Sequence, residues 1–148
     1  MKLRNISLAA FAVVFLDQLT KFILTNKQYS LLQMNIINYT ENTGAAFSIL
    51  EGYRWLFIGI SSAALIILIY YTTRHIKGQQ KALQISFGML MGGMTGNLID
   101  RIFLGYVRDF IDLKIWPVFN IADSAIFIAV IILVIQLIRK NKDGQKYN

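Results

Sequence analysis

The stretch Val118–Ile138, VFNIADSAIFIAVIILVIQLI, places an acidic start in front of a long apolar run. A helix needs about 20 predominantly apolar residues to cross the hydrocarbon core of a bilayer, and this stretch has that length. Three earlier stretches are similar in length and character: Ile6–Leu24, Tyr53–Thr73 and Ala82–Leu104. The sequence therefore predicts four transmembrane helices.

The composition supports one membrane domain that spans residues 1–148. Hydrophobic residues make up 55% of the chain, which has a single proline, and no linker rich in glycine and serine divides it. Such a balance is typical of helical membrane proteins. The stretch Tyr29–Leu50 contains β-branched residues that partly alternate, which favours short strands. We expect an all-α four-transmembrane-helix bundle with a small extracytoplasmic β-like cradle and a short outer loop.

The net charge of +7 follows the pattern of a membrane protein. Lysines and arginines flank the apolar stretches at both ends of the chain and in the Arg74–Lys81 loop. The positive-inside rule places these segments in the cytoplasm, and it places Thr25–Gly52 and Gly105–Pro117 outside. A basic patch for nucleic acid is therefore excluded.

Several kinds of chemistry are excluded by the residues that the chain lacks. It has no cysteine and one histidine, His75. Disulfides, thiol nucleophiles and cysteine metal sites are impossible, and a zinc site or a Ser-His-Asp triad is disfavoured. Ser61 and Ser62 lie in an apolar segment with no lysine or histidine at a spacing that would bring it beside them, which argues against a serine nucleophile. We expect no metal and no cofactor.

Two carboxylates at the outer surface are the strongest functional signal. Asp109 and Asp123 each lie beside a long apolar run, where a carboxylate is costly unless it has a partner or a function. Two carboxylates that converge can share a proton, as in an aspartic protease. The alternative is structural, because Asn120 and Asp123 could cap the helix that follows Pro117. Asp112 is expected to be a solvated surface acid.

Further polar residues lie close to the membrane. Asp17 and Lys21 are one helical turn apart, so they form an internal ion pair or a support that orients the site. Asn97, Asp100 and Arg101 share one helix face. Asp100 and Arg101 are adjacent and are expected to bond across the bundle, for structural or functional reasons.

Small residues suggest close backbone approaches in two places. Gly88, Gly92 and Gly96 recur every four residues, which predicts a smooth stripe for helix packing. Asn42 precedes Gly44 in a segment of small residues, which indicates either a tight turn or a substrate cradle with the Asn42 amide as a clamp.

Five motifs in this order resemble those of the bacterial lipoprotein signal peptidases, the signal peptidase II family. They are Asp17-Gln18-x-Thr20-Lys21, Asn42-x-Gly44-Ala45-Ala46-Phe47, Gly92-Gly93-x-x-Gly96-Asn97-x-x-Asp100-Arg101, Val107-x-Asp109-Phe110 and Phe119-Asn120-x-Ala122-Asp123. The resemblance covers nearly the whole chain. It implies an aspartic endopeptidase of the bacterial inner membrane that cleaves diacylglyceryl-modified prolipoproteins on the amino side of the lipidated lipobox cysteine.

The resemblance also implies roles for individual residues. Asp109 and Asp123 would form the catalytic dyad, and their fourteen-residue separation is a few residues shorter than usual for the family. The residues implied to bind substrate or support the site are Asn42, Asn97, Asp100, Arg101, Asn120, Asp17 and Lys21. The partners implied are prolipoprotein substrates and membrane lipid, with no nucleic acid and no obligate protein partner.

The alternative interpretation is a membrane protein that is not an enzyme. Asp17, Lys21, Asp100 and Arg101 could form a proton path in a four-helix carrier, or the chain could bind lipoprotein precursors without cutting them. A carrier is expected to show repeated halves with interrupted helices, and no such repeat is visible.

Overall fold

The computed structural model describes residues 3–24, 36–44, 52–76 and 79–145, with side chains described as far as residue 139. The elements along the chain are α1 (Arg4–Leu24), β1 (Ile37–Asn42), α2 (Arg54–Tyr71), the π-helical turn η2 (Thr72–Ile76), α3 (Lys81–Phe103), β2 (Val107–Ile111) and α4 (Ile121–Gln145). The fold is mostly helical with one small two-stranded sheet.

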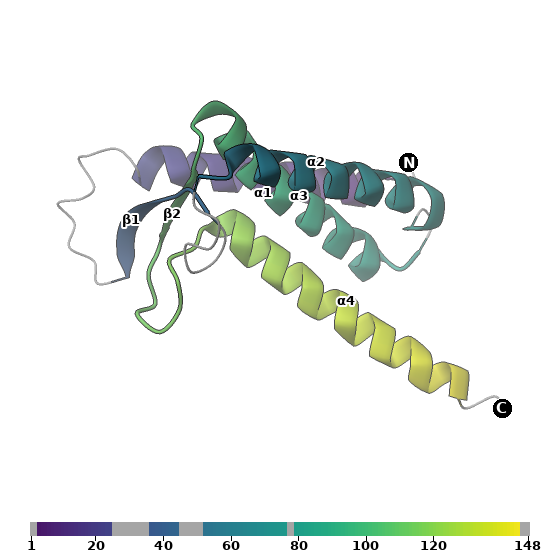
Figure 1. The fold of residues 1–148 in the computed structure, drawn as a ribbon. Coiled ribbons are helices and arrows are strands. Elements are labelled where there is room, and N and C mark those ends of the chain that lie inside the picture. The colour runs from purple at the N-terminus through teal and green to yellow at the C-terminus, as the bar shows by residue number, and fades with distance from the viewer. Residues whose placement is uncertain (1–2, 25–35, 45–51, 77–78, 146–148) are drawn as a thin grey trace.

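Helix α3 is the centre of the molecule. It packs against α1 along one side, α4 along another and α2 along a third. The sheet of β1 and β2 lies at one end of the helices, beside the C-terminal end of α3 and the start of α4 (Figure 1). The start of α1 and the C-terminal end of α4 lie at the opposite end.

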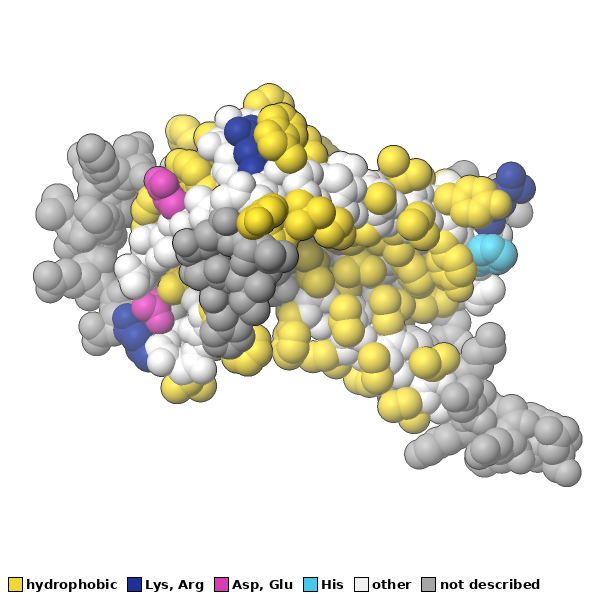
Figure 2. Space-filling view, in the orientation of Figure 1, with side chains coloured by type: hydrophobic (Ala, Val, Ile, Leu, Met, Phe, Trp, Pro, Cys, Tyr) yellow, Lys and Arg dark blue, Asp and Glu magenta, His cyan; other side chains and the backbone are white. Residues whose placement is uncertain are grey.

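The outer surface of the helices is apolar. Within the described residues, three helical segments are long and apolar enough to cross a membrane: Arg4–Leu24, Arg54–Ile76 and Ile121–Arg139. No residue of α2 is buried inside the protein. Figure 2 shows apolar side chains across the middle of one face and charged side chains toward its two ends. Such a surface is suited to contact with lipid.

The glycine stripe of α3 packs as predicted. A Cβ atom on Gly92 would lie 2.7 Å from the Ala10 carbonyl oxygen and 2.8 Å from the Val13 Cβ of α1. Gly88 and Gly96 also face α1, whereas Gly93 faces α4, where a Cβ would lie 2.5 Å from the Ala122 carbonyl oxygen. These glycines let α3 approach both neighbours closely.

Gly92→Ala is expected to destabilise the protein by about 1–3 kcal/mol, since the new methyl group would force α1 and α3 apart. Gly59→Ala is the matched control, because nothing lies within 4 Å of the methyl group that it adds to α2. The control is expected to be neutral or to stabilise by up to about 1 kcal/mol. Unfolding in mixed micelles measures both, and equal effects would contradict this account of the packing.

Both predicted ends of the last helix and the predicted outer loop need correction, and α4 ends at Gln145 instead of Ile138. Helix α4 begins at Ile121 and not at Val118, because Phe119 forms a β-bridge with Ile111 and its backbone N–H donates to the Ile111 carbonyl at 3.0 Å. The outer connection after α3 contains a strand, β2, which pairs antiparallel with β1. Of the stretch expected to form a β-like cradle, residues 29–35 and 45–50 lie outside the described residues.

Candidate active site

Asp109 lies on the inner face of β2, where it is 2% exposed. It lies opposite Thr40 of β1. Both of its carboxylate oxygens accept hydrogen bonds from amide side chains. Asn42 Nδ2 donates to Oδ2 at 2.9 Å, and Asn120 Nδ2 donates to Oδ1 at 2.6 Å. The short sheet therefore brings residues of two distant segments onto one carboxylate.

Asp123 lies in the first turn of α4 and is partly buried. Asn97 Nδ2 of α3 donates to its Oδ1 at 2.7 Å. The backbone N–H of Asp123 donates to Asn120 Oδ1 at 2.9 Å, and the backbone N–H of Asn120 donates to Asp123 Oδ2 at 3.3 Å. This is the reciprocal pattern of a helix cap. The capping prediction is confirmed, and it leaves Asp123 Oδ1 directed away from the backbone toward Asn97.

Asn120 and Asn97 connect the two carboxylates. Asn120 Nδ2, which donates to Asp109, also lies 3.1 Å from Asn97 Oδ1. Asn97 in turn donates to Asp123. Asn120 is completely buried and Asn97 is 8% exposed, so water competes little for these bonds. Asp109 and Asp123 are thus held in one continuous hydrogen-bonded chain.

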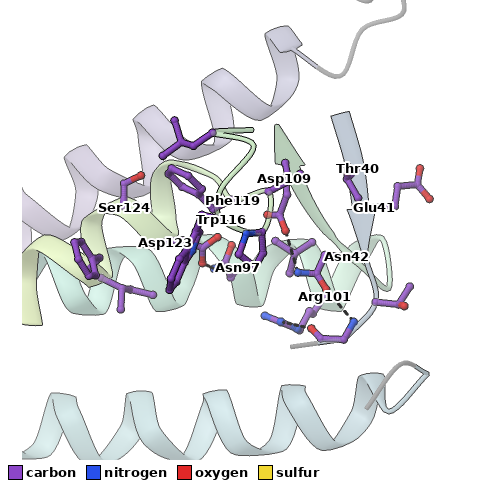
Figure 3. Close-up of a pocket in the computed structure, with 18 of the residues that line it drawn as sticks. Thr40, Glu41, Asn42, Asn97, Arg101, Asp109, Trp116, Phe119, Asp123 and Ser124 are labelled. Atoms are coloured by element: carbon purple, nitrogen blue, oxygen red, sulfur yellow. Dashed lines mark hydrogen bonds between the residues drawn. The ribbon is translucent and has the colours of Figure 1, made fainter. Parts of the chain in front are cut away.

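Both aspartates line one cavity of about 930 Å³. Figure 3 shows Asp109 beside Asn42 and Asp123 beside Asn97 along its wall. The polar residues of the wall include Asn42, Asn97, Arg101, Asp109 and Asp123, and the apolar residues include Trp116, Phe119, Phe127 and Val130. Two carboxylates in a largely apolar cavity are suited to a hydrolytic site that binds an apolar substrate.

Arg101 lies in the same cavity wall. Its Nη2 donates to the Gly44 carbonyl at 3.3 Å, and its guanidinium lies 5.2 Å from the ring centre of Phe57. Asn42 Oδ1 accepts a hydrogen bond from the Gly44 backbone N–H at 3.0 Å, so the turn predicted at this position is present. Ala45, Ala46 and Phe47 of the same motif lie outside the described residues.

The Asp109 carboxyl holds its proton more tightly than an ordinary aspartate. Its pKa is raised from 3.8 to about 6, chiefly by burial and also by the charge of Asp123, while the hydrogen bonds from Asn42 and Asn120 oppose the increase. Between pH 3.8 and about 6, the Asp109 carboxyl group therefore keeps its proton in the folded protein but has lost it in the unfolded chain. Stability falls as the pH rises through this window.

A carbodiimide, which reacts with protonated carboxyl groups, is expected to label Asp109 with a midpoint near pH 6 and progressively less at higher pH. Asp123→Asn removes a neighbouring negative charge, so the midpoint is expected to fall in that variant. Asp112 is the internal control, because its pKa is lowered to about 2 by hydrogen bonds from Lys114 and Asn38. Labelling is measured by mass spectrometry of peptides, and a midpoint near pH 4 would contradict the burial of Asp109.

Three of the predicted supporting residues lie behind the cavity. Asp17, Lys21 and Asp100 are completely buried and do not belong to the described cavity wall. Lys21 Nζ lies 2.9 Å from Asp17 Oδ2 and 3.2 Å from Asp100 Oδ2, so the internal ion pair predicted within the first helix extends to α3. Lys21 Nζ also donates to Asn97 Oδ1 at 3.1 Å, which connects the ion pairs to the site.

Two residues of this network were missed as site residues by sequence reasoning. Gln18 donates to Asp100 Oδ1 at 3.2 Å, and Arg108 Nη2 lies 2.7 Å from the same oxygen. Gln18 stands in the first of the five quoted motifs, but no role was assigned to it, and the signal at Arg108 was its charge next to Asp109. Asp112, expected to be solvated, is 8% exposed and accepts hydrogen bonds from Asn38 and Lys114, so that prediction was wrong.

Comparison with known proteins gives the family. A family model described as signal peptidase (SPase) II matches residues 9–139. The lipoprotein signal peptidase of Halothermothrix orenii is 41% identical over 139 residues, which cover 89% of this chain and 94% of that protein. The lipoprotein signal peptidase of Bacillus subtilis is 37% identical over 139 residues, which cover 87% and 90% of the two chains.

A solved structure agrees with these relatives. It is described as a bacterial membrane enzyme at 2.3 Å resolution and is 34% identical, with a TM-score of 0.80 over 92% of this chain and 88% of that one. The matches do not favour a carrier or a non-catalytic binding protein. This chain therefore belongs to the signal peptidase II family, as an aspartic peptidase of the inner membrane that removes signal peptides from lipoproteins.

Proposed function

We propose that Asp109 and Asp123 are the catalytic dyad of this peptidase. The observation that carries the proposal is that both carboxylates line one cavity and are joined through Asn120 and Asn97. The bond cleaved is the one on the amino side of the lipidated lipobox cysteine of a diacylglyceryl-modified prolipoprotein.

The chemistry follows from two carboxylates that cannot both ionise easily. They share one proton, so that one is ionised and the other is neutral. The ionised carboxylate takes a proton from a water molecule, which attacks the scissile carbonyl carbon, and the neutral carboxyl group donates its proton to the carbonyl oxygen. The two groups then exchange roles as the amine leaves.

The amide side chains and Arg101 hold the reacting groups in place. Asn42 and Asn120 engage both oxygens of Asp109, which fixes the plane of that carboxylate. Among the described residues, the Arg101 side chain donates a long hydrogen bond of 3.3 Å to the Gly44 carbonyl. Its remaining N–H groups are suited to hold a carbonyl oxygen of the substrate backbone.

The apolar part of the cavity suits the lipid of the substrate. Phe127, Ile128 and Val130 of α4 line the cavity and are also exposed on the helix surface. A diacylglyceryl group at this wall keeps its chains against the apolar face of α4 and in the bilayer, while the peptide bond reaches the acids.

The test is cleavage of a diacylated lipobox peptide by the purified protein in detergent. Mass spectrometry is expected to locate the cut on the amino side of the lipidated cysteine, and the same peptide without the lipid is expected to be cut far more slowly. Cleavage at another bond, or equal rates with and without lipid, would contradict the proposed specificity.

We also propose that α3 is a fourth transmembrane helix and that both termini are cytoplasmic. A 23-residue helix is about 34 Å long, which is enough to cross the bilayer. Its polar residues contact α1, α4 and β2, so they need not face lipid. In this orientation the sheet and the active site lie near the extracytoplasmic surface as a small cradle.

Cysteine labelling tests the orientation, since the chain has no cysteine of its own. Lys114→Cys is expected to react with a membrane-impermeant maleimide added to intact spheroplasts. His75→Cys, at the other end of the helices, is expected to react only after the membrane is permeabilised. The reverse pattern would invert the topology.

A further inference from the structure

The Asp100 carboxylate accepts three hydrogen bonds from Arg108, the residue that precedes Asp109. The backbone N–H and the Nε of Arg108 donate to Asp100 Oδ2 at 3.0 and 3.2 Å, and Arg108 Nη2 donates to Oδ1 at 2.7 Å. Asp100 is completely buried and the Arg108 side chain is 16% exposed. One carboxylate of α3 therefore fixes both the backbone and the side chain of β2 at position 108.

The same carboxylate also reaches toward Asp123. Asp100 Oδ2 lies 3.2 Å from Lys21 Nζ, which donates to Asn97 Oδ1 at 3.1 Å. Asn97 then donates to Asp123 Oδ1 at 2.7 Å. Asp100 is thus a junction with one branch to the strand that carries Asp109 and one branch to the amide that holds Asp123.

The strand β2 needs such an anchor. The sheet formed by the described residues has two strands, and a two-stranded ribbon is marginally stable by itself. Side chains alternate along a strand, so Arg108 projects from the face opposite to Asp109. Arg108 is accordingly absent from the described cavity wall and does not touch the substrate site. The motif quoted around Asp109, Val107-x-Asp109-Phe110, leaves position 108 open.

We propose that the Arg108–Asp100 ion pair is a positioning device that sets the place of Asp109 relative to Asp123. The inference rests on the proposed dyad. A guanidinium holds a carboxylate through two parallel bonds and so fixes direction as well as distance. A displacement of about 1 Å at reacting groups can lower a rate by about 10²-fold, which makes such an anchor matter for turnover.

The experiment compares Arg108→Met and Arg108→Lys with the wild type, using the diacylated lipobox peptide. Arg108→Met is expected to lower kcat by about 10- to 100-fold with KM changed less than about threefold. Lysine keeps the positive charge but cannot form the two parallel hydrogen bonds of a guanidinium, so Arg108→Lys is expected to recover part of the kcat that Arg108→Met loses. Lys114→Met is the matched control, because it removes an ion pair of the same outer region in which the Lys114 side chain is 62% exposed, and kcat is expected to be unchanged.

The outcomes separate this inference from the dyad assignment. Each rate is divided by the amount of folded protein, which is measured from the amplitude of the thermal unfolding transition. A wild-type kcat in Arg108→Met, with only a lower unfolding temperature, would overturn the positioning role. If Arg108→Met does not fold, Arg108→Lys decides, and a wild-type kcat there overturns the inference. Asp109→Asn is run beside them, and activity in that variant would overturn the dyad instead.

Discussion

Asp109→Asn and Asp123→Asn are each expected to lower the cleavage rate by about 10³-fold or more. Asparagine preserves the size of the side chain but cannot take up or release a proton. Loss of either carboxylate removes the shared proton, so the remaining acid cannot both activate water and protonate the carbonyl oxygen. The double variant is expected to be no worse than either single one, because the two groups act as a unit.

The measurement is the initial rate on the diacylated lipobox peptide, with the unfolding temperature of each variant recorded in the same detergent. Asp112→Asn is the control. Asp112 is a neighbouring buried carboxylate of the outer region that does not belong to the described cavity wall. It is expected to keep a rate within a few-fold of the wild type. Rates near the wild-type value in either dyad variant would refute the assignment.

Lys21→Met is expected to have the largest effect on stability, a loss of about 3–5 kcal/mol. Lys21, Asp17 and Asp100 are all completely buried, and the ammonium lies within 3.2 Å of both carboxylates. Removal of the ammonium leaves two negative charges near each other without this compensation. Arg108 compensates Asp100 in part, which places the expected loss within this range and not above it.

The free energy of unfolding in mixed micelles measures this loss, as a function of the denaturing detergent. Lys114→Met is the control, since the Lys114 side chain is 62% exposed and such pairs contribute about 0–1 kcal/mol. A loss below about 1 kcal/mol in Lys21→Met would show that water or a second cation reaches the buried acids.

The helices were predictable because their signal is local. The apolar runs, the flanking basic residues and the glycine stripe can each be read within one segment, and the segments expected at Ile6–Leu24 and Ala82–Leu104 agree with α1 and α3 to within a few residues. The start of α4 was wrong by three residues. The reason is that Phe119 bonds to Ile111, a contact that depends on the strand before it.

The pairing of the outer segments was not predictable from the sequence. Strand β2 was expected to be a connection, because a strand of five residues carries little periodic signal by itself. It forms because β1, which lies about 70 residues earlier, supplies the backbone partners that pair Thr40 with Asp109 and Asn42 with Val107. That pairing brings the Asn42 amide within 2.9 Å of Asp109.

By itself, the sequence determined the family, the apolar helices and the prediction of Asp109 and Asp123 as a dyad, since these depend on residue type and order along the chain. Only the tertiary structure decided which polar groups meet. It joined Asp109 to Asp123 through Asn120 and Asn97, and it made Asp100 the common partner of Arg108 and Lys21. The physical reason is that a buried polar group bonds to whichever partner the packing of α1, α3 and β2 brings within hydrogen-bonding distance. The separation of two residues along the chain does not determine that distance in space.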